Sequence, residues 1–139
     1  MNFDPDIVLA KSSTVRKCLR AIREVRAQPD PVREWMILDV TILNLQRAVQ
    51  ACLDLANHLI ALNGWELPRS ARHSIEILAA KVVLPPEILP ALVGMVGFRN
   101  IAVHDYTALN PAIVESLVRD HLGDLEAFVA AIIAAAPDR

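Results

Sequence analysis

Three pairs of an aspartate or asparagine followed by a proline constrain the fold of this sequence more than any other feature. Each pair places a side chain that can cap a helix directly before a proline, which is tolerated at the first helical position because its missing N–H would have no partner there. The three pairs are Asp4-Pro5, Asp30-Pro31 and Asn110-Pro111. A further helix start is marked by Pro85-Pro86 and Pro90, and a helix end by Asn63-Gly64.

Together with the spacing of apolar residues, these signals predict five helices. They cover about residues 5–27, 31–62, 69–81, 90–106 and 111–135. No segment alternates with period two for long enough to suggest a strand. We therefore expect a single all-α domain over residues 1–139, which is large enough to bury a core without disulfides or a structural metal.

The composition narrows the class of protein further. The hydrophobic share is 54% with only 4% aromatic residues, an excess that favours burial of part of the surface in a subunit interface. A net charge of −2 argues against binding nucleic acid through bulk charge but allows a local basic patch. Cys18 and Cys52 lie among apolar residues without metal-ligand spacing, so we interpret them as reduced core thiols.

The sequence shows no targeting signal. Asp4 and Asp6 stand where a signal peptide would be basic, and no uncharged apolar run reaches the ~18 residues of a membrane span. We expect a cytoplasmic protein without membrane contact.

The first predicted helix carries an arginine stripe. Arg16, Arg20 and Arg23 follow helical spacing opposite the apolar face. Such a stripe is more often a solvated surface, but arginines along one face can also follow an RNA backbone.

The second predicted helix has a core stripe that begins at Trp35 and a narrower polar stripe. The polar stripe consists of Asp39, Gln46, Gln50, Asp54 and Asn57. His58 follows Asp54 at the i, i+4 spacing that lets two side chains pair on one surface. An exposed face is the commoner explanation, although amides and small acids are less typical of a purely solvated surface.

The fourth predicted helix turns from apolar to polar at Arg99. Arg99 and Tyr106 are seven residues apart and share a face to within about 20°, while Asn100 and His104 share another. Histidine can move a proton to or from a ribose 2′-hydroxyl or a leaving oxygen, and arginine can stabilise the charged phosphorane. Gly94 and Gly97 weaken the helix and suggest close approach of another backbone. An arginine and a histidine at this spacing also occur by chance, so spacing alone leaves a non-catalytic surface open.

The extended motif resembles a known family. Residues 98–106 (FRNIAVHDY) look like the R-x4-H-x-Y signature of HepT-like toxins of the HEPN superfamily. Residues 44–48 (NLQRA) and 53–60 (LDLANHLI) are similar to the matching helix of that family. The likeness extends from about residue 8 to 130 and includes the order of the helices.

The resemblance implies an antiparallel up-and-down bundle that forms a homodimer, with paired motifs facing one cleft. It implies a metal-independent endoribonuclease without a cofactor, in which Arg99 and His104 are catalytic and Asn100 orients the histidine. Asp39 and Asp54 would line the cleft, and His58 is a further candidate beside them. It also implies a toxin neutralised by a minimal nucleotidyltransferase (MNT) antitoxin, which can transfer AMP to the motif tyrosine, here Tyr106.

Two alternatives stay open at this point. The chain could be a HEPN-type partner of a nucleotidyltransferase that binds RNA or nucleotide without cutting. It could also be a purely structural helical protein in which Arg99 is paired with a core acid.

Overall fold

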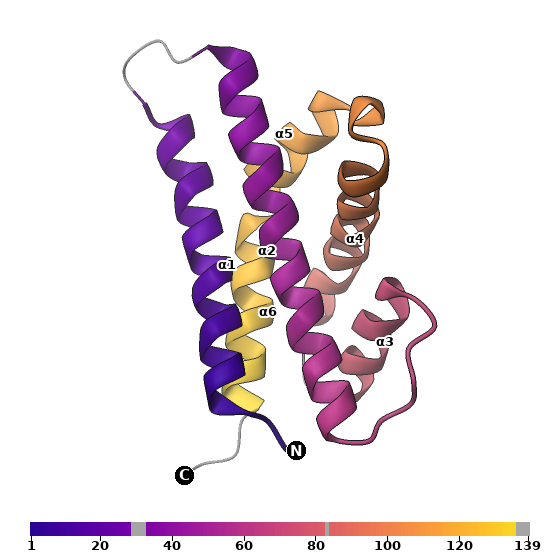
Figure 1. Cartoon of the computed structure of the whole chain (residues 1–139). Helices are drawn as coiled ribbons and strands as arrows, with labels where there is room; N and C mark the ends of the chain where they lie inside the picture. The colour runs from indigo at the N-terminus through magenta and orange to yellow at the C-terminus, as the bar shows by residue number, and fades with distance from the viewer. Residues whose placement is uncertain (29–32, 83, 136–139) are drawn as a thin grey trace.

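The computed structural model describes residues 1–28, 33–82 and 84–135, and every regular element within these ranges is helical (Figure 1). The prediction of an all-α fold is confirmed. The α-helices are α1 (Pro5–Arg26), α2 (Glu34–Leu62), α3 (Ala71–Lys81), α4 (Leu89–His104), α5 (Pro111–Asp120) and α6 (Leu122–Ala135). Two short 3-10 turns, η1 (Pro86–Ile88) and η2 (Tyr106–Ala108), flank α4.

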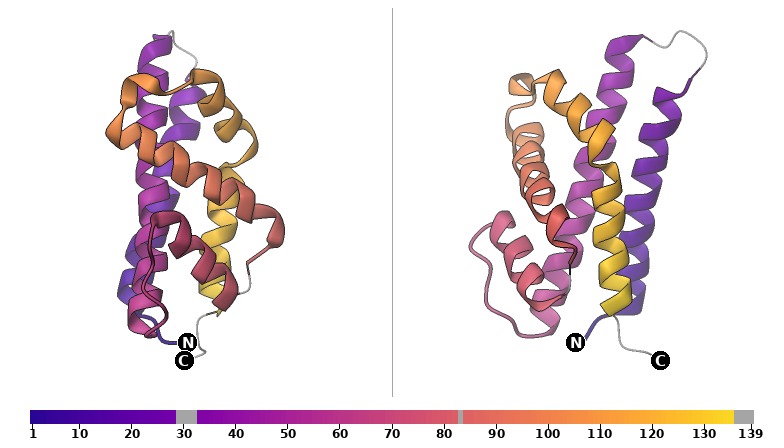
Figure 2. Two further views of the ribbon diagram at one scale, coloured as in Figure 1. Left: turned by 90° about the vertical axis from the view of Figure 1, so that its right-hand side faces the viewer. Right: turned by 180° about the vertical axis from the view of Figure 1, so that it is seen from behind.

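The long helix α2 is the centre of an up-and-down bundle. It contacts α1, α3, α4 and α6, and its longest contact is with its antiparallel neighbour α1. Figure 2 shows α6 running along the back of α1 and α2. Helix α4 crosses α2 at a slant, on the side of α2 away from α1. The end of α4 that carries the motif therefore lies across α2 from α1.

The predicted helix signals are largely confirmed. The side chain of Asp4 accepts a hydrogen bond from the backbone N–H of Asp6, and that of Asn110 accepts one from Ala112, both at 2.9 Å. Gly64 follows the end of α2 with φ +63°, the left-handed conformation that ends helices. The pair at positions 30–31 lies outside the described residues, and α2 begins at Glu34 rather than at 31.

Two further predicted boundaries are wrong. The last predicted helix is two helices, because the backbone turns at His121, whose ring approaches the Asp124 carboxylate at 2.8 Å. Gly123 weakens a continuous helix at this point, and the bend lets α6 pack on α1 and α2. The motif helix ends at His104 rather than at 106, since Asp105 has the non-helical angles φ −152° and ψ 67°.

The core stripe of α2 is buried from Ile42 to Leu59, but Trp35 is 55% exposed. The prediction of Trp35 as a core residue is wrong, because the first turn of α2 lies at the end of the bundle, before the buried stretch that starts at Thr41. Cys18 and Cys52 are buried and free, as predicted, and burial raises the pKa of both thiols.

Within the described part of the chain, the segment Pro86–His104 is long and apolar enough, by composition alone, to cross a membrane. It contains Glu87 and Arg99, and α4 packs against α2, α3 and α6. The core helix of a soluble bundle has the same composition, so this feature is weak evidence for a membrane span.

Candidate active site

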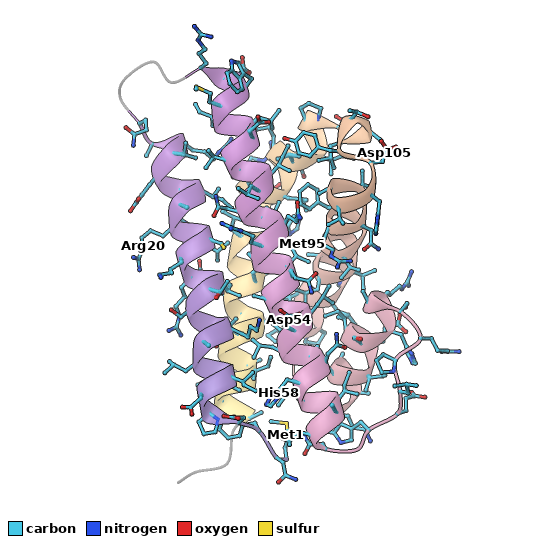
Figure 3. All side chains as sticks on the ribbon, in the orientation of Figure 1. Met1, Arg20, Asp54, His58, Met95 and Asp105 are labelled. Carbon is cyan, nitrogen blue, oxygen red and sulfur yellow. The ribbon has the colours of Figure 1, made fainter. Side chains whose placement is uncertain are left out.

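The polar end of α4 presents its side chains in different directions. Arg99 is half-buried against α2, whereas His104 is the last residue of the helix and is exposed. Five residues of α-helix separate the two by about 140° around the axis. Asp105, labelled in Figure 3, follows at the end of the bundle where the chain leaves α4. One copy of the chain therefore does not enclose a site between Arg99 and His104.

The guanidinium of Arg99 is fixed by two side-chain oxygens. Its Nε–H donates to Oε1 of Gln50 on α2 at 2.9 Å, and its Nη1 donates to Oδ1 of Asn100 at 2.7 Å. These bonds use two of the five donors that an arginine carries. Both partners are neutral, so the positive charge of Arg99 is positioned without being cancelled.

The expectation that Asn100 orients His104 is not what the structure shows. The amide oxygen of Asn100 accepts from Arg99 instead. A hydrogen bond from a charged donor such as a guanidinium is stronger than one between neutral groups. Asn100 is therefore a positioning residue for the arginine.

Gln50 connects Arg99 to the ion pair between Asp54 and Lys11. Its amide nitrogen donates to Asp54 at 2.9 Å, and Asp54 also accepts from the ammonium of Lys11 on α1 at 2.8 Å. Of the predicted cleft residues, Asp54 thus reaches Arg99 only through Gln50. The sequence places Gln50 in the polar stripe, but the packing of α4 on α2 is what makes it the partner of the arginine.

Tyr106 lies in η2 and is held from α2. Its hydroxyl donates to Oδ1 of Asp39 at 2.6 Å. This hydrogen bond, with partial desolvation and the charge of Asp39, raises the pKa of Tyr106 to about 12. The predicted shared helix face of Arg99 and Tyr106 is wrong because α4 ends before Tyr106, whereas the structure does bring Asp39 to the motif.

His58 lies away from the motif. Its Nε2 accepts from the backbone N–H of Asp4 at 3.0 Å and so ties the N-terminal segment to α2. The predicted pairing of Asp54 with His58 is wrong, since Asp54 binds Lys11 and Gln50 instead. In Figure 3 His58 lies near Met1, at the end of the bundle opposite to Asp105.

The arginine stripe of α1 faces away from the motif. Arg16, Arg20 and Arg23 line a groove of about 590 Å³ between α1 and α6. Arg23 forms an ion pair with Glu126 at 2.6 Å. Figure 3 shows Arg20 on the outer side of α1, on the far side of α2 from α4. Contact of this stripe with RNA stays a prediction.

Among the described residues, no three His, Cys, Asp or Glu side chains gather in a way that could hold a metal ion. Arg99 itself lines a hollow of about 280 Å³ between α2, α4 and the start of α3, together with Gln50 and Arg69. The chemistry available on this surface is that of a fixed cation, an exposed imidazole and a phenol.

An all-α bundle that presents Arg-x4-His at the end of one helix is the arrangement that the resemblance to HEPN nucleases predicts, and comparisons with known proteins test it. A family model described as "Ribonuclease HepT-like" matches residues 15–132. The mRNA nuclease HepT of Shewanella oneidensis is 38% identical over 125 residues, which cover 89% of this chain and 94% of that protein. The chain therefore belongs to the family of HepT-like ribonucleases, and its activity class is endoribonuclease.

Solved structures agree with this assignment. The tri-AMPylated Shewanella oneidensis HEPN toxin, in complex with MNT antitoxin, matches with a TM-score of 0.83 at 38% identity, covering 96% of this chain and 99% of that chain. A toxin–antitoxin structure with AMP-PNP matches with a TM-score of 0.84 at 38% identity, covering 93% and 98%. YutE from Bacillus subtilis, at 17% identity and a TM-score of 0.79, shares the fold alone.

Proposed function

We propose that the chain is the toxin of a toxin–antitoxin pair and cleaves RNA with Arg99 and His104, without a metal ion. The observation that carries this proposal is the fixed guanidinium of Arg99, held by Gln50 and Asn100 with most of its donors unused. Such a group can bind the charged oxygens of a phosphodiester as they develop more charge. His104, exposed at the end of the same helix, supplies an imidazole that can donate or accept a proton.

The reaction that fits these groups is transesterification within the RNA. The 2′-oxygen attacks the adjacent phosphorus, the P–O2′ bond forms and the P–O5′ bond breaks. A proton leaves the 2′-hydroxyl and another reaches the departing 5′-oxygen, and His104 is suited to either transfer. The products are a 2′,3′-cyclic phosphate and a free 5′-hydroxyl, with Arg99 neutralising the phosphorane between them.

The active unit in this proposal is a homodimer. Arg99 and His104 point apart on a single helix, so a second copy would supply the missing half of a shared cleft. Gly94 and Gly97 support this arrangement, because beyond the neighbouring turns of α4 no atom of the described residues lies within 4 Å of an added Cβ at either position. Ile101, on the same side of α4, is 43% exposed. A second backbone approaching this face would explain the glycines and cover the isoleucine.

The antitoxin in this proposal is a minimal nucleotidyltransferase that transfers AMP to Tyr106. The related HEPN toxin is tri-AMPylated in its complex with MNT antitoxin. Here the phenol oxygen would attack the α-phosphorus of a nucleoside triphosphate, pyrophosphate would leave, and the phenol proton would pass to Asp39 at 2.6 Å. The adenylate adds charge and bulk beside the motif and so competes with RNA phosphate. Because RNA and nucleoside triphosphates are found in the cytoplasm, we propose that the protein acts there.

Expression of the wild-type chain and of His104→Ala in the absence of antitoxin tests the nuclease. We expect growth arrest, and RNA fragments with 2′,3′-cyclic phosphate ends, only from the wild type. Cleavage of RNA by the wild type should be the same with and without a metal chelator. His104 is exposed, so the melting temperature should be unchanged by the substitution. His121→Ala is the matched control and should remain toxic. An equally toxic His104→Ala variant would refute catalysis by this motif.

A further inference from the structure

Gln50 stands where two surface hollows meet. One hollow, of about 420 Å³, lies between α1 and α2 and is lined by Lys11, Lys17, Arg47 and Gln50 among others. The second is the hollow of about 280 Å³ that contains Arg99, and Gln50 lines it as well. The two hollows therefore adjoin at Gln50, and we treat them together as one depression that leads from α1 across α2 to Arg99.

The charge of this depression is strongly positive. Among the described residues that line it, the cations are Lys11, Lys17, Arg47, Arg69 and Arg99, and the one carboxylate is Asp54. Asp54 is neutralised by Lys11 at 2.8 Å and gives its second oxygen to Gln50. Lys17 and Arg47 are exposed and have no carboxylate within ion-pair distance in the described part of the chain. Their charges are therefore available to a ligand.

The groove beside the arginine stripe of α1 is a less favourable site for a polyanion. Its three arginines share the groove with Glu24 and Glu126, and Arg23 is bound to Glu126. None of Gln50, Arg99, Asn100 and His104 lines it. A polyanion in this groove would meet two carboxylates and end away from the reactive groups.

We propose that single-stranded RNA reaches Arg99 along the depression that starts at Lys17 and Arg47, passes Gln50 and continues toward Arg69. This inference rests on the proposed cleavage of RNA. Along α2 the track runs from Asn44 to Asn57, a length of about 20 Å at the helical rise per residue. Unpaired cations placed at intervals over that length match the spaced phosphates of a strand, and the amides and hydroxyls between them can donate hydrogen bonds to ribose and phosphate oxygens.

Equilibrium binding to uncleaved RNA tests the track. In a His104→Ala background, the dissociation constant of a single-stranded RNA roughly 12 nucleotides long is measured at several salt concentrations. The pair Lys17→Gln/Arg47→Gln should weaken binding about tenfold and make the salt dependence shallower by about 1.4 in log–log slope, because two phosphate contacts are lost. The matched pair Arg16→Gln/Arg20→Gln removes the same charge from exposed positions and should change binding by no more than about twofold.

Three results would overturn the track. RNA affinity could fall equally in both double variants, it could fall only in Arg16→Gln/Arg20→Gln, or it could be unchanged in Lys17→Gln/Arg47→Gln. A cleavage assay separates this inference from the proposed function. The defect of Lys17→Gln/Arg47→Gln in kcat/KM should be about tenfold larger for the long RNA than for a dinucleotide, which spans only the reacting phosphate. If the wild type cleaves neither RNA, the proposed function fails, while the binding measurement still decides whether the track exists.

Discussion

The Nε–H of Arg99 on α4 donates to the side-chain oxygen of Gln50 on α2 across 2.9 Å. Gln50 is a neutral partner, so it orients the guanidinium without cancelling its charge. A carboxylate at this position would compete with the phosphate of a substrate, whereas an amide leaves the arginine free to bind it. The same amide donates to Asp54, which keeps the oxygen of Gln50 turned toward Arg99.

Replacing Gln50 with leucine should slow cleavage with little effect on folding. Arg99 loses its partner on α2 and samples more orientations, so we expect kcat to fall about tenfold, equivalent to about 1.4 kcal/mol in the barrier. Gln46→Leu, one helical turn earlier, is the matched control and should keep full activity. Steady-state kinetics together with thermal melting make the measurement. A parallel loss of melting temperature and activity in Gln50→Leu would indicate a purely structural role.

Replacing Gly97 with leucine should separate the stability of the chain from its association. None of the described residues outside α4 occupies the space beside Gly97, and a glycine in a helix interior costs about 1 kcal/mol relative to alanine. The single chain should therefore fold at least as well, while the proposed dimer should dissociate and lose RNA cleavage. Sedimentation and activity assays measure both properties. Gly123→Leu, another exposed helical glycine, should remain dimeric; a fully active dimeric Gly97→Leu would place the interface elsewhere.

The ionisation of Tyr106 should be displaced to high pH. It is the only tyrosine of the chain, so the ultraviolet absorbance of the phenolate reports on this residue alone. With its pKa raised from 10.0 to about 12, the neutral phenol is favoured in the folded state. This contribution to stability is complete below pH 10 and is lost as the pH rises toward 12.

Asp39→Asn should return the midpoint of Tyr106 toward its ordinary value, because the negative charge beside the phenol is removed. Asp105→Asn is the control, since the Asp105 side chain bonds Thr107 rather than the phenol. Circular dichroism over the same pH range checks that the fold persists. A wild-type midpoint at the ordinary value would contradict the hydrogen bond to Asp39.

Two buried serines should respond in opposite directions to removal of the hydroxyl. Ser12 Oγ is buried and has no hydrogen-bond partner among the residues that the structure describes, whereas Ser74 Oγ donates to Asn57 at 2.7 Å. Ser12→Ala should raise the free energy of unfolding by about 1 kcal/mol, and Ser74→Ala should lower it by a similar amount. Urea unfolding of both variants gives the comparison. Destabilisation by Ser12→Ala would mean that its hydroxyl is satisfied.

The sequence by itself determined the local order of the chain and its family. The Asx-Pro caps, the apolar spacing and Asn63-Gly64 act within a few residues, so they predict helices without knowledge of the fold. The Arg-x4-His spacing and its flanking residues likewise need no tertiary contact to be recognised. The errors are local too: only Gly123 hinted at the bend at His121, and the apolar spacing did not mark the end of α4 at His104.

Only the tertiary structure decided which side chains meet. Gln50, Asp54 and Lys11 come from two helices, and α4 must pack against α2 before Arg99 finds its partner. The same holds for the cations. In sequence the stripe of Arg16, Arg20 and Arg23 looks the most basic, but folding brings Glu126 of α6 beside it. Among the described residues, Lys17 and Arg47 are left without an ion-pair partner. Charge compensation between distant segments is a property of the packed bundle, which the spacing of residues along one helix cannot reveal.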